Sequence, residues 1–408
     1  MIVPQVIKRE YASGFKAEVA LRPGFNENFF GIMVDFGSAD PQGVAGSAHF
    51  LEHKLFTKKS GDLAHEFEAL GADCNAFTSS NETMFYCQGS THTPKLIELL
   101  FKLVGEPYFT TANVKHEVPI IQQELAMYQD DPKWWVNDAL KRQLYGNSLL
   151  GLDVAGTQTS ISQITAAQLA QVYASQYVAG QLNFIAAGDF SKNQIQTIFR
   201  QVTKLAERYF KAGRLAPRPE QPTGHLRHQT LTNRGSNYFG LAIRLPHFAP
   251  FQGSRDLAQT LLEFMLDAEF GPLSAWYQHQ QSRQLLNSGL QLTMEYARQG
   301  NCLLLTGVSQ QPDEVLAAIK AQLAQPLANV LGPAQFELQK KASFAHTVRS
   351  YNDLSLWAIE LAEAALDGDD PYDLATKLEV LGFSEYQAAC EQLMQGAKVG
   401  SAALGGSD

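Results

Sequence analysis

Residues 46–56 read Gly-Ser-Ala-His-Phe-Leu-Glu-His-Lys-Leu-Phe, and this stretch holds the strongest local pattern in the chain. It contains His49, Glu52 and His53, which form an H-x-x-E-H string. On an α-helix, residues three and four positions apart lie on the same side, one turn above the other. We therefore expect a helix that directs two imidazoles and one carboxylate toward a single point. The alternative is a polar helix face that holds two histidines by chance.

A zinc site is the chemistry that suits this set of side chains. Two neutral imidazoles four residues apart can bind one Zn²⁺, and a carboxylate just before the second histidine can hold and deprotonate a water molecule at the metal. The order H-x-x-E-H is the inverzincin signature, the reverse of the H-E-x-x-H string. A tetrahedral catalytic zinc also needs a third protein ligand and keeps one position open.

The third ligand is expected from a second element, and the best candidate is Glu124. It ends the segment Glu117-Val-Pro-Ile-Ile-Gln-Gln-Glu. Glu117 and Glu124 are seven residues apart and project from one helix face, while Ile120, Ile121 and Leu125 form an apolar stripe. One carboxylate could bind the metal and the other could support a ligand from behind.

A hairpin is predicted over residues 74–87. Residues 74–80 lack a helical period, residues 83–87 are β-prone, and a turn is expected at Ser79-Ser-Asn81. An edge strand at this place can bind an extended peptide through its backbone. The alternative is an ordinary surface hairpin.

These segments together resemble the insulinase/pitrilysin family of zinc peptidases, which includes the mitochondrial processing peptidases. The runs at residues 106–110 and 127–132 resemble more closely its YmfH-like bacterial branch. The similarity spans most of residues 30–190 and is weak beyond residue 230. The residues that carry it are the stretch 46–56, Asn75-Ala-Phe-Thr-Ser79, Thr83, Tyr86, Glu117 and Glu124.

The resemblance implies a zinc-dependent endopeptidase that cleaves peptides with a metal-activated water. The zinc ligands that it implies are His49, His53 and Glu124. Glu52 takes the role of general base, and Glu117 that of a supporting catalytic carboxylate.

The resemblance also implies where substrate binds. Asn75, Ala76 and Phe77 would lie on the strand that runs along the bound peptide.

Composition sets the outer bounds. With 408 residues, 45% of them hydrophobic, the chain exceeds the usual size of one domain. A net charge of −9 argues against a nucleic-acid scaffold. The N-terminus lacks the order of a signal peptide and no apolar run approaches eighteen residues, so we expect a cytoplasmic protein without a membrane segment. The four cysteines show no C-x-x-C spacing and are expected to be reduced thiols.

An internal duplication is predicted from two pairs of similar segments. Residues 29–36 resemble residues 238–245, and Pro94 before a helical stretch is echoed by Pro312. A Pro- and Gly-rich linker at residues 211–224 separates the halves. We therefore predict an α+β fold with two related domains, 1–210 and 225–408, each a mostly antiparallel sheet with helices packed on one face.

The second half differs where the first carries its motif. Residues 256–265 contain no histidine, so the half 225–408 is expected to be non-catalytic. In the resembling family this half grips substrate with an Arg and a Tyr seven residues apart. Here Arg283 is out of register and Leu292 stands in the place of Tyr. We therefore expect a heterodimer with a related non-catalytic subunit, and a homodimer as the alternative.

Two other functions stay open at this point. The chain could be a catalytically silent binding or assembly subunit with the same fold. The metal site could also be purely structural, which would require a further ligand such as Cys74 or Cys87.

Overall fold

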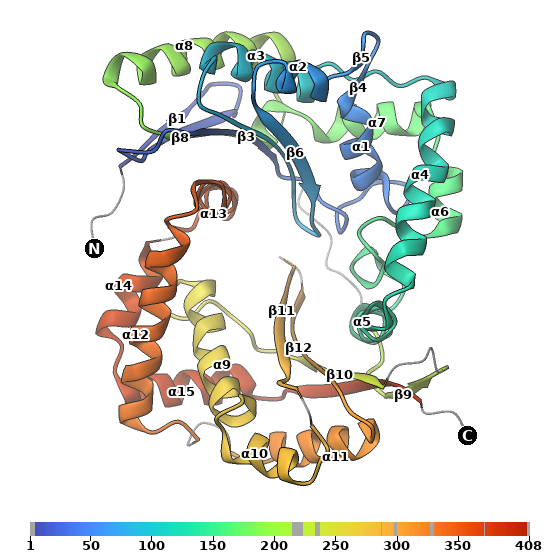
Figure 1. The fold of residues 1–408 in the computed structure, drawn as a ribbon, viewed down its shortest axis with the longest axis vertical. Helices are drawn as coiled ribbons and strands as arrows, with labels where there is room; N and C mark the ends of the chain where they lie inside the picture. Colours follow the sequence, from blue (N-terminus) through green and yellow to red (C-terminus); the bar gives the residue numbers. More distant parts are fainter. Residues whose placement is uncertain are drawn as a thin grey trace. The chain divides into compact units, whose positions relative to one another are not determined.

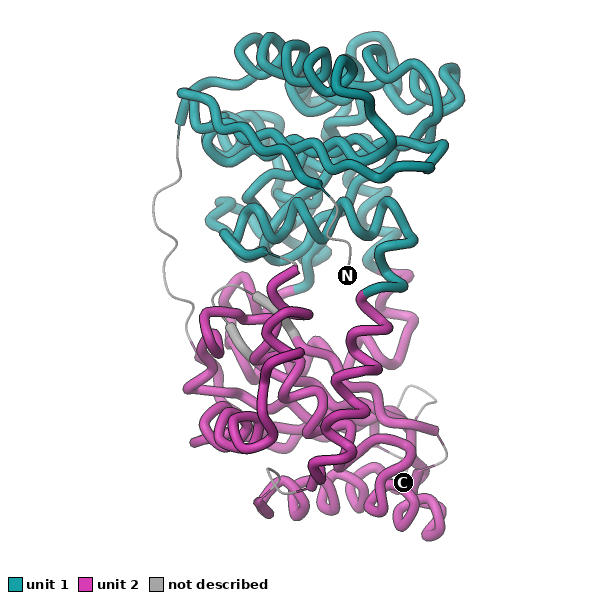
Figure 2. The backbone as a smooth tube through the Cα atoms, turned by 90° about the vertical axis from the view of Figure 1, so that its left-hand side faces the viewer, with its two compact units in different colours: residues 1–125, 153–219, 348–371 teal, residues 126–152, 220–347, 372–408 magenta. Residues whose placement is uncertain are grey.

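The computed structural model describes residues 5–213, 223–232, 237–286, 288–297, 300–326, 330–370 and 372–405. The chain forms two compact units, coloured separately in Figure 2. Unit 1 comprises residues 1–125, 153–219 and 348–371, and unit 2 comprises residues 126–152, 220–347 and 372–408. The predicted division at residues 211–224 would place residues 126–152 in the first domain and residues 348–371 in the second. The compact units group them the other way round. Residues 214–222 of the expected linker lie outside the described residues, and the domain boundaries stay a prediction.

Unit 1 is built on a sheet whose six described strands have the order β1-β2-β8-β3-β7-β6. Neighbouring strands are antiparallel except for the parallel pair β2 and β8. The strands are β1 (Val6–Glu10), β2 (Lys16–Leu21), β3 (Asn28–Val34), β6 (Asp73–Thr78), β7 (Thr83–Gly89) and β8 (Leu182–Gly188). A small hairpin of β4 (Thr57–Lys58) and β5 (Gly61–Asp62) stands apart from this sheet.

Helices cover both faces of the unit 1 sheet. Phe30, Ile32 and Val34 of β3 belong to the main hydrophobic core of unit 1, which also contains buried residues of α1, α3, α7 and α8. Phe29 and Met33 are fully buried on the opposite face, because side chains alternate along a strand. Figure 1 shows α3 and α8 on one face and α13, which packs against β3 and β8, on the other. The helices are α1 (Ser47–Phe56), α2 (Ala64–Glu68), α3 (Thr93–Gly105), α4 (Thr111–Gln129), α6 (Gln158–Gln163), α7 (Ala166–Gln176), α8 (Lys192–Tyr209) and α13 (Leu354–Asp367).

Unit 2 is built on a sheet whose five described strands have the order β11-β12-β10-β13-β9. The strands are β9 (His228–Leu231), β10 (Tyr238–Arg244), β11 (Gln291–Ala297), β12 (Gly300–Val308) and β13 (Lys398–Leu404). The helices are α5 (Pro132–Tyr145), α9 (Arg255–Phe270), α10 (Ala275–Ser282), α11 (Pro312–Leu323), α12 (Pro333–Ser350), α14 (Asp373–Val380) and α15 (Phe383–Met394). Helix α5 packs against β10 and β13. It approaches closely at Gly240, where an added Cβ would lie 2.7 Å from Leu140 and 2.8 Å from Val136.

Five strands of the unit 1 sheet share their order and relative directions with the five described strands of unit 2, and β1 has no counterpart among the described strands. Strands β2, β8, β3, β7 and β6 of unit 1 correspond to β9, β13, β10, β12 and β11 of unit 2, and each contains one parallel pair. Gly31 and Gly240 lie in the equivalent strands β3 and β10, and Pro94 and Pro312 lie at the starts of the equivalent helices α3 and α11. The predicted fold class is therefore confirmed. The structure adds one helix on the second face of each sheet, α13 in unit 1 and α5 in unit 2.

No helix in the described part of the chain is both long and apolar enough to span a membrane.

Candidate metal centre

Helix α1 carries the H-x-x-E-H string and is anchored by its apolar side. Ala48, Phe50, Leu51 and Leu55 are fully buried in the unit 1 core. The helix begins after Gly46, whose φ of 89° is readily adopted only by glycine. A Cβ at Gly46 would also lie 2.6 Å from the carbonyl oxygen of Ala155. The start of α1, and with it the direction of its polar side chains, is therefore set by close backbone packing.

The structure brings His49, His53 and Glu124 together. His49 Nε2 lies 3.6 Å from Glu124 Oε1, and His53 Nε2 lies 3.5 Å from Glu124 Oε2. One donor atom from each residue lies within 4.8 Å of the others. Two ligands of a tetrahedral Zn²⁺ that each lie about 2.0–2.1 Å from the metal are about 3.3 Å apart. The spacing and the donor set of two imidazoles and one carboxylate both fit a zinc ion.

The cysteines do not belong to this group. Cys74 and Cys87 face each other in register on β6 and β7, and both are free thiols. Burial raises the pKa of Cys74 to about 11 and raises that of Cys87 as well. Neither thiol belongs to the group of donor atoms around His49, and the His, Cys, Asp and Glu side chains of the described residues offer no fourth donor that would close the site.

Glu117 lies behind His53 and sets its tautomer. His53 Nδ1 is 3.3 Å from Glu117 Oε1. Because a carboxylate only accepts, Nδ1 carries the proton and the lone pair of Nε2 is left to face Glu124. Burial works to lower the pKa of His53, but this hydrogen bond and the nearby carboxylates, Glu52 among them, outweigh burial and raise it.

Lys54 holds the other oxygen of Glu117. Its Nζ lies 2.8 Å from Glu117 Oε2 and 3.1 Å from Thr57 Oγ1, and the residue is only 2% exposed. Burial works to raise the pKa of Glu117, but the hydrogen bonds from His53 and Lys54 and the positive charge of Lys54 hold it at about 2. The carboxylate is therefore ionised and held from both sides. Lys54 was missed by sequence reasoning, because a lysine beside the motif gives no sign that it is buried.

Glu52 is half-buried beside the metal ligands. Its Oε2 accepts a hydrogen bond of 2.5 Å from Thr78 Oγ1, the last residue of β6. Burial, then the neighbouring Tyr173 and the charge of Glu52, raise the pKa of Tyr177 well above its usual value, so this phenol behind Glu52 stays neutral.

Asn75, Ala76 and Phe77 lie on β6, which pairs only with β7 among the described strands and so forms an edge of the sheet. The strand runs next to α1. Asn75 is exposed, and its side-chain oxygen accepts a hydrogen bond of 2.8 Å from the backbone amide of Ala76. The predicted turn follows directly, because residues 79–82 connect β6 to β7.

A pocket of about 570 Å³ opens beside this cluster. The hairpin β4–β5 and the first half of α4 form its walls together with α1. Its lining residues are Glu52, His53, Lys54, Phe56, Thr57, Gly61, Asp62, Asn113, His116, Glu117 and Ile120. Sequence reasoning did not identify Asp62 or Asn113, because a single aspartate or asparagine outside a motif gives no sign that it lines a pocket.

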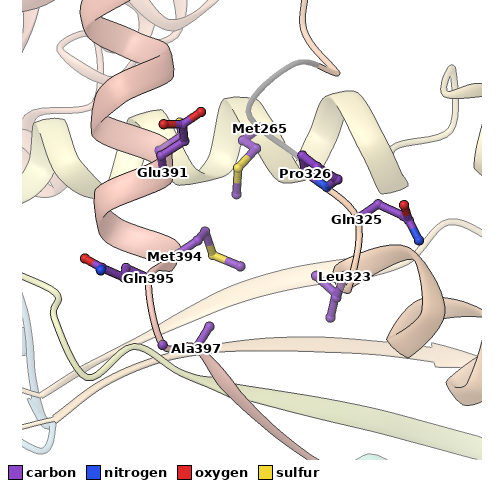
Figure 3. A pocket seen from close by; sticks show the side chains of 10 residues that line it. Met265, Leu323, Gln325, Pro326, Glu391, Met394, Gln395 and Ala397 are labelled. Atoms are coloured by element: carbon purple, nitrogen blue, oxygen red, sulfur yellow. The ribbon is translucent and has the colours of Figure 1, made fainter.

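A separate pocket of about 350 Å³ lies within unit 2 (Figure 3). Met265 of α9 and Met394 of α15 direct their side chains into it. It contains none of the predicted site residues and no histidine.

The region of unit 2 that corresponds to α1 is α9, which contains no histidine. Arg283 directly follows α10 and lies 3.4 Å from Glu314, in a pair with both side chains about half exposed. Leu292 lies on β11, the counterpart of β6. The described part of unit 2 therefore offers no second copy of the metal cluster.

Comparison with known proteins agrees with this geometry. Residues 27–158 match the model of the insulinase family, peptidase family M16. The uncharacterized zinc protease YmfH of Bacillus subtilis (strain 168) is 25% identical over 403 residues, which cover 93% of this chain and 92% of that protein.

Two solved structures share the fold over nearly the whole chain. A putative M16-like peptidase from Alicyclobacillus acidocaldarius has a TM-score of 0.88 at 22% identity, covering 99% of both chains. A peptidase M16 inactive domain from Pseudomonas fluorescens has a TM-score of 0.84 at 16% identity, also covering 99% of both chains. The motif-bearing region, the full-length relative and the shared fold agree: the chain resembles the insulinase family, peptidase family M16, and its residues 27–158 match that family's model.

Proposed function

We propose that this chain is a zinc-dependent endopeptidase that cleaves peptides with a metal-activated water. The observation that carries the proposal is the convergence of His49, His53 and Glu124 beside Glu52, at the end of an edge strand. A metal ligand set, a base and a surface for an extended chain are the three parts that peptide hydrolysis needs.

His49, His53 and Glu124 would hold the zinc ion. When bound there, zinc supplies a Lewis acid that polarises a carbonyl group and lowers the pKa of a water molecule to roughly 7. Glu117 keeps His53 in the tautomer that a metal requires, and Lys54 keeps Glu117 ionised and in place.

Glu52 is proposed as the general base. It takes a proton from the attacking water and returns it to the leaving amine. Its neighbours suit this role, since Thr78 holds one carboxylate oxygen and the pocket leaves the residue accessible from the side of α4.

The backbone of Asn75, Ala76 and Phe77 is proposed to bind the substrate as an added strand. An edge strand gives affinity through main-chain hydrogen bonds and tolerates many side chains. In the free protein the Asn75 side chain covers the Ala76 amide, which protects the edge from unwanted pairing.

A partner subunit is part of the proposal. Arg283 is paired with Glu314, and Leu292 occupies the place where an aromatic hydroxyl is expected. A related non-catalytic subunit would supply the missing substrate contacts, with a homodimer as the alternative. The cytoplasmic location stays a prediction.

The competing function is a silent binding or assembly subunit with the same fold. It is favoured by the likeness to a structure described as an inactive domain. The buried Lys54–Glu117–His53 arrangement argues for the peptidase, because packing alone does not require a buried ion pair behind a histidine.

Substitution separates the two functions. The zinc-loaded protein, alone and with its partner, is incubated with a mixed peptide library, and the products are followed by mass spectrometry. Glu52→Gln should keep zinc and lose cleavage, whereas His49→Ala should lose zinc. Glu98→Gln, at an exposed position of α3, is the matched control and should behave as the parent. Cleavage by Glu52→Gln at the parental rate would refute the assigned base.

A further inference from the structure

The edge strand β6 and the proposed base meet at one hydrogen bond. The hydroxyl of Thr78, the last residue of β6, donates to Glu52 Oε2 over 2.5 Å. We propose that Thr78 is a positioning residue that fixes the Glu52 carboxylate and ties it to the strand that binds substrate. This inference rests on the proposed function, because Glu52 acts as a base only there.

The direction of this hydrogen bond follows from the neighbouring groups. Thr83 is the register partner of Thr78, and its hydroxyl donates to the carbonyl oxygen of Phe36 over 3.0 Å. The two threonine hydroxyls are 3.4 Å apart, too far to compete with the contact to Glu52. A carboxylate only accepts, so the proton of Thr78 points to Glu52. A separation of 2.5 Å is typical of a hydroxyl bonded to an ionised carboxylate.

The contact restricts what Glu52 can do. With Oε2 held by Thr78, the other carboxylate oxygen is left to take a proton from water. A free glutamate side chain would rotate among several rotamers, and a displacement of about 1 Å in a catalytic group can cost about 100-fold in rate.

The contact also connects the proposed base, Glu52, to the proposed substrate-binding residues 75–77, because Thr78 and these residues belong to the same strand, β6. Thr78 directly follows the segment 75–77, and its side chain lies on the same face of β6 as that of Ala76. A peptide that adds to the edge of β6 would therefore order the backbone that carries the Thr78 hydroxyl.

The inference is tested with three variants at one position. Thr78→Val is nearly isosteric and removes the donor, Thr78→Ala removes it without placing a methyl group against Glu52, and Thr78→Ser restores it. We expect kcat to fall about 10- to 100-fold in the first two, as for loss of a hydrogen bond to a charged group, with KM within about twofold of the parent. Thr78→Ser should recover kcat to within about threefold, and all three should keep the parental zinc content.

A readout independent of activity uses thermal unfolding of the metal-free protein. Thr78→Val should lower Tm in the parent but not in a Glu52→Ala background, where the acceptor is already absent. Thr230→Val, at an exposed position of strand β9, controls for the threonine-to-valine change itself. An equal drop in Tm in both backgrounds would show that Thr78 does not act on Glu52.

The outcomes distinguish the two proposals. If Glu52→Gln abolishes cleavage while Thr78→Val and Thr78→Ala keep the parental kcat, the positioning role is wrong and the proposed function stands. If Glu52→Gln cleaves as fast as the parent, or the parent with its partner does not cleave, both proposals fail.

Discussion

Replacing Lys54 by methionine is expected to weaken the metal centre, although Lys54 is not a proposed ligand. Lys54 and Glu117 are 2% and 9% exposed, and their charged groups are 2.8 Å apart. Methionine is similar in length and apolar, so the substitution removes the charge while largely conserving the volume. Glu117 would then remain buried with only His53 as its partner.

The size of the effect follows from this geometry. Removing one partner of a buried ion pair costs about 3–5 kcal/mol, because the other charge is left uncompensated. His53 remains 3.3 Å from Glu117, so we expect the lower end, about 3 kcal/mol, in the unfolding free energy of the metal-free protein. Loss of a group that supports a metal ligand weakens metal binding by about 10- to 100-fold.

Two measurements check this prediction. Urea unfolding of the protein in a chelator gives the stability, and competition with a zinc-binding dye gives the affinity. The double variant Lys54→Met/Glu117→Gln should recover most of the stability, because no charge is left unpaired. Lys95→Met breaks an exposed pair with Glu98 and should change stability by less than about 0.5 kcal/mol. A Lys54→Met protein as stable as the parent, or a double variant no more stable than the single one, would refute the reasoning.

Three further substitutions probe other parts of unit 1. Gly46→Ala should lower stability by about 1–3 kcal/mol and reduce zinc occupancy, since it strains a positive φ and contacts Ala155; calorimetry and metal analysis test this. Burial lowers the pKa of Lys58 to about 7, below about 10.4 in the unfolded chain, so the folded protein binds fewer protons and its unfolding free energy rises with pH in that window. In urea titrations, the unfolding free energy of the parent should therefore increase by about 2 kcal/mol from pH 7 to pH 9, and Lys58→Met should abolish this increase. Glu124→Gln should weaken zinc binding at least about 100-fold, and retention of zinc through dialysis against a chelator would contradict its role.

The spacing of the motif was enough to predict that its three side chains share one side of a helix. His49, Glu52 and His53 depend only on helical geometry, which is local. The approach of Glu124 is not local. A pair of glutamates on a helix more commonly faces solvent, and Glu124 is singled out because the histidine motif requires a third ligand from a second element, which the resemblance to a known family then also implies.

The support behind the ligands could not be predicted for a different reason. Lys54 and Thr78 contact Glu117 and Glu52, which are distant from them in the chain. A lysine and a threonine in such positions are compatible with exposed surface, and only the folded packing decides their burial. The positions of α13 and α5 could not be predicted either, because an apolar helix face does not indicate which sheet the helix will pack against.

The place of α13 has a consequence for how the protein is made. Unit 1 contains residues 354–367 as well as the proposed metal ligands, so a growing chain cannot cover both faces of its first sheet until residue 367 has left the ribosome. Until then Phe29 and Met33 lack the helix that packs against their strand. A nascent chain that stops near residue 210 would expose this apolar surface and become a substrate for chaperones or proteases.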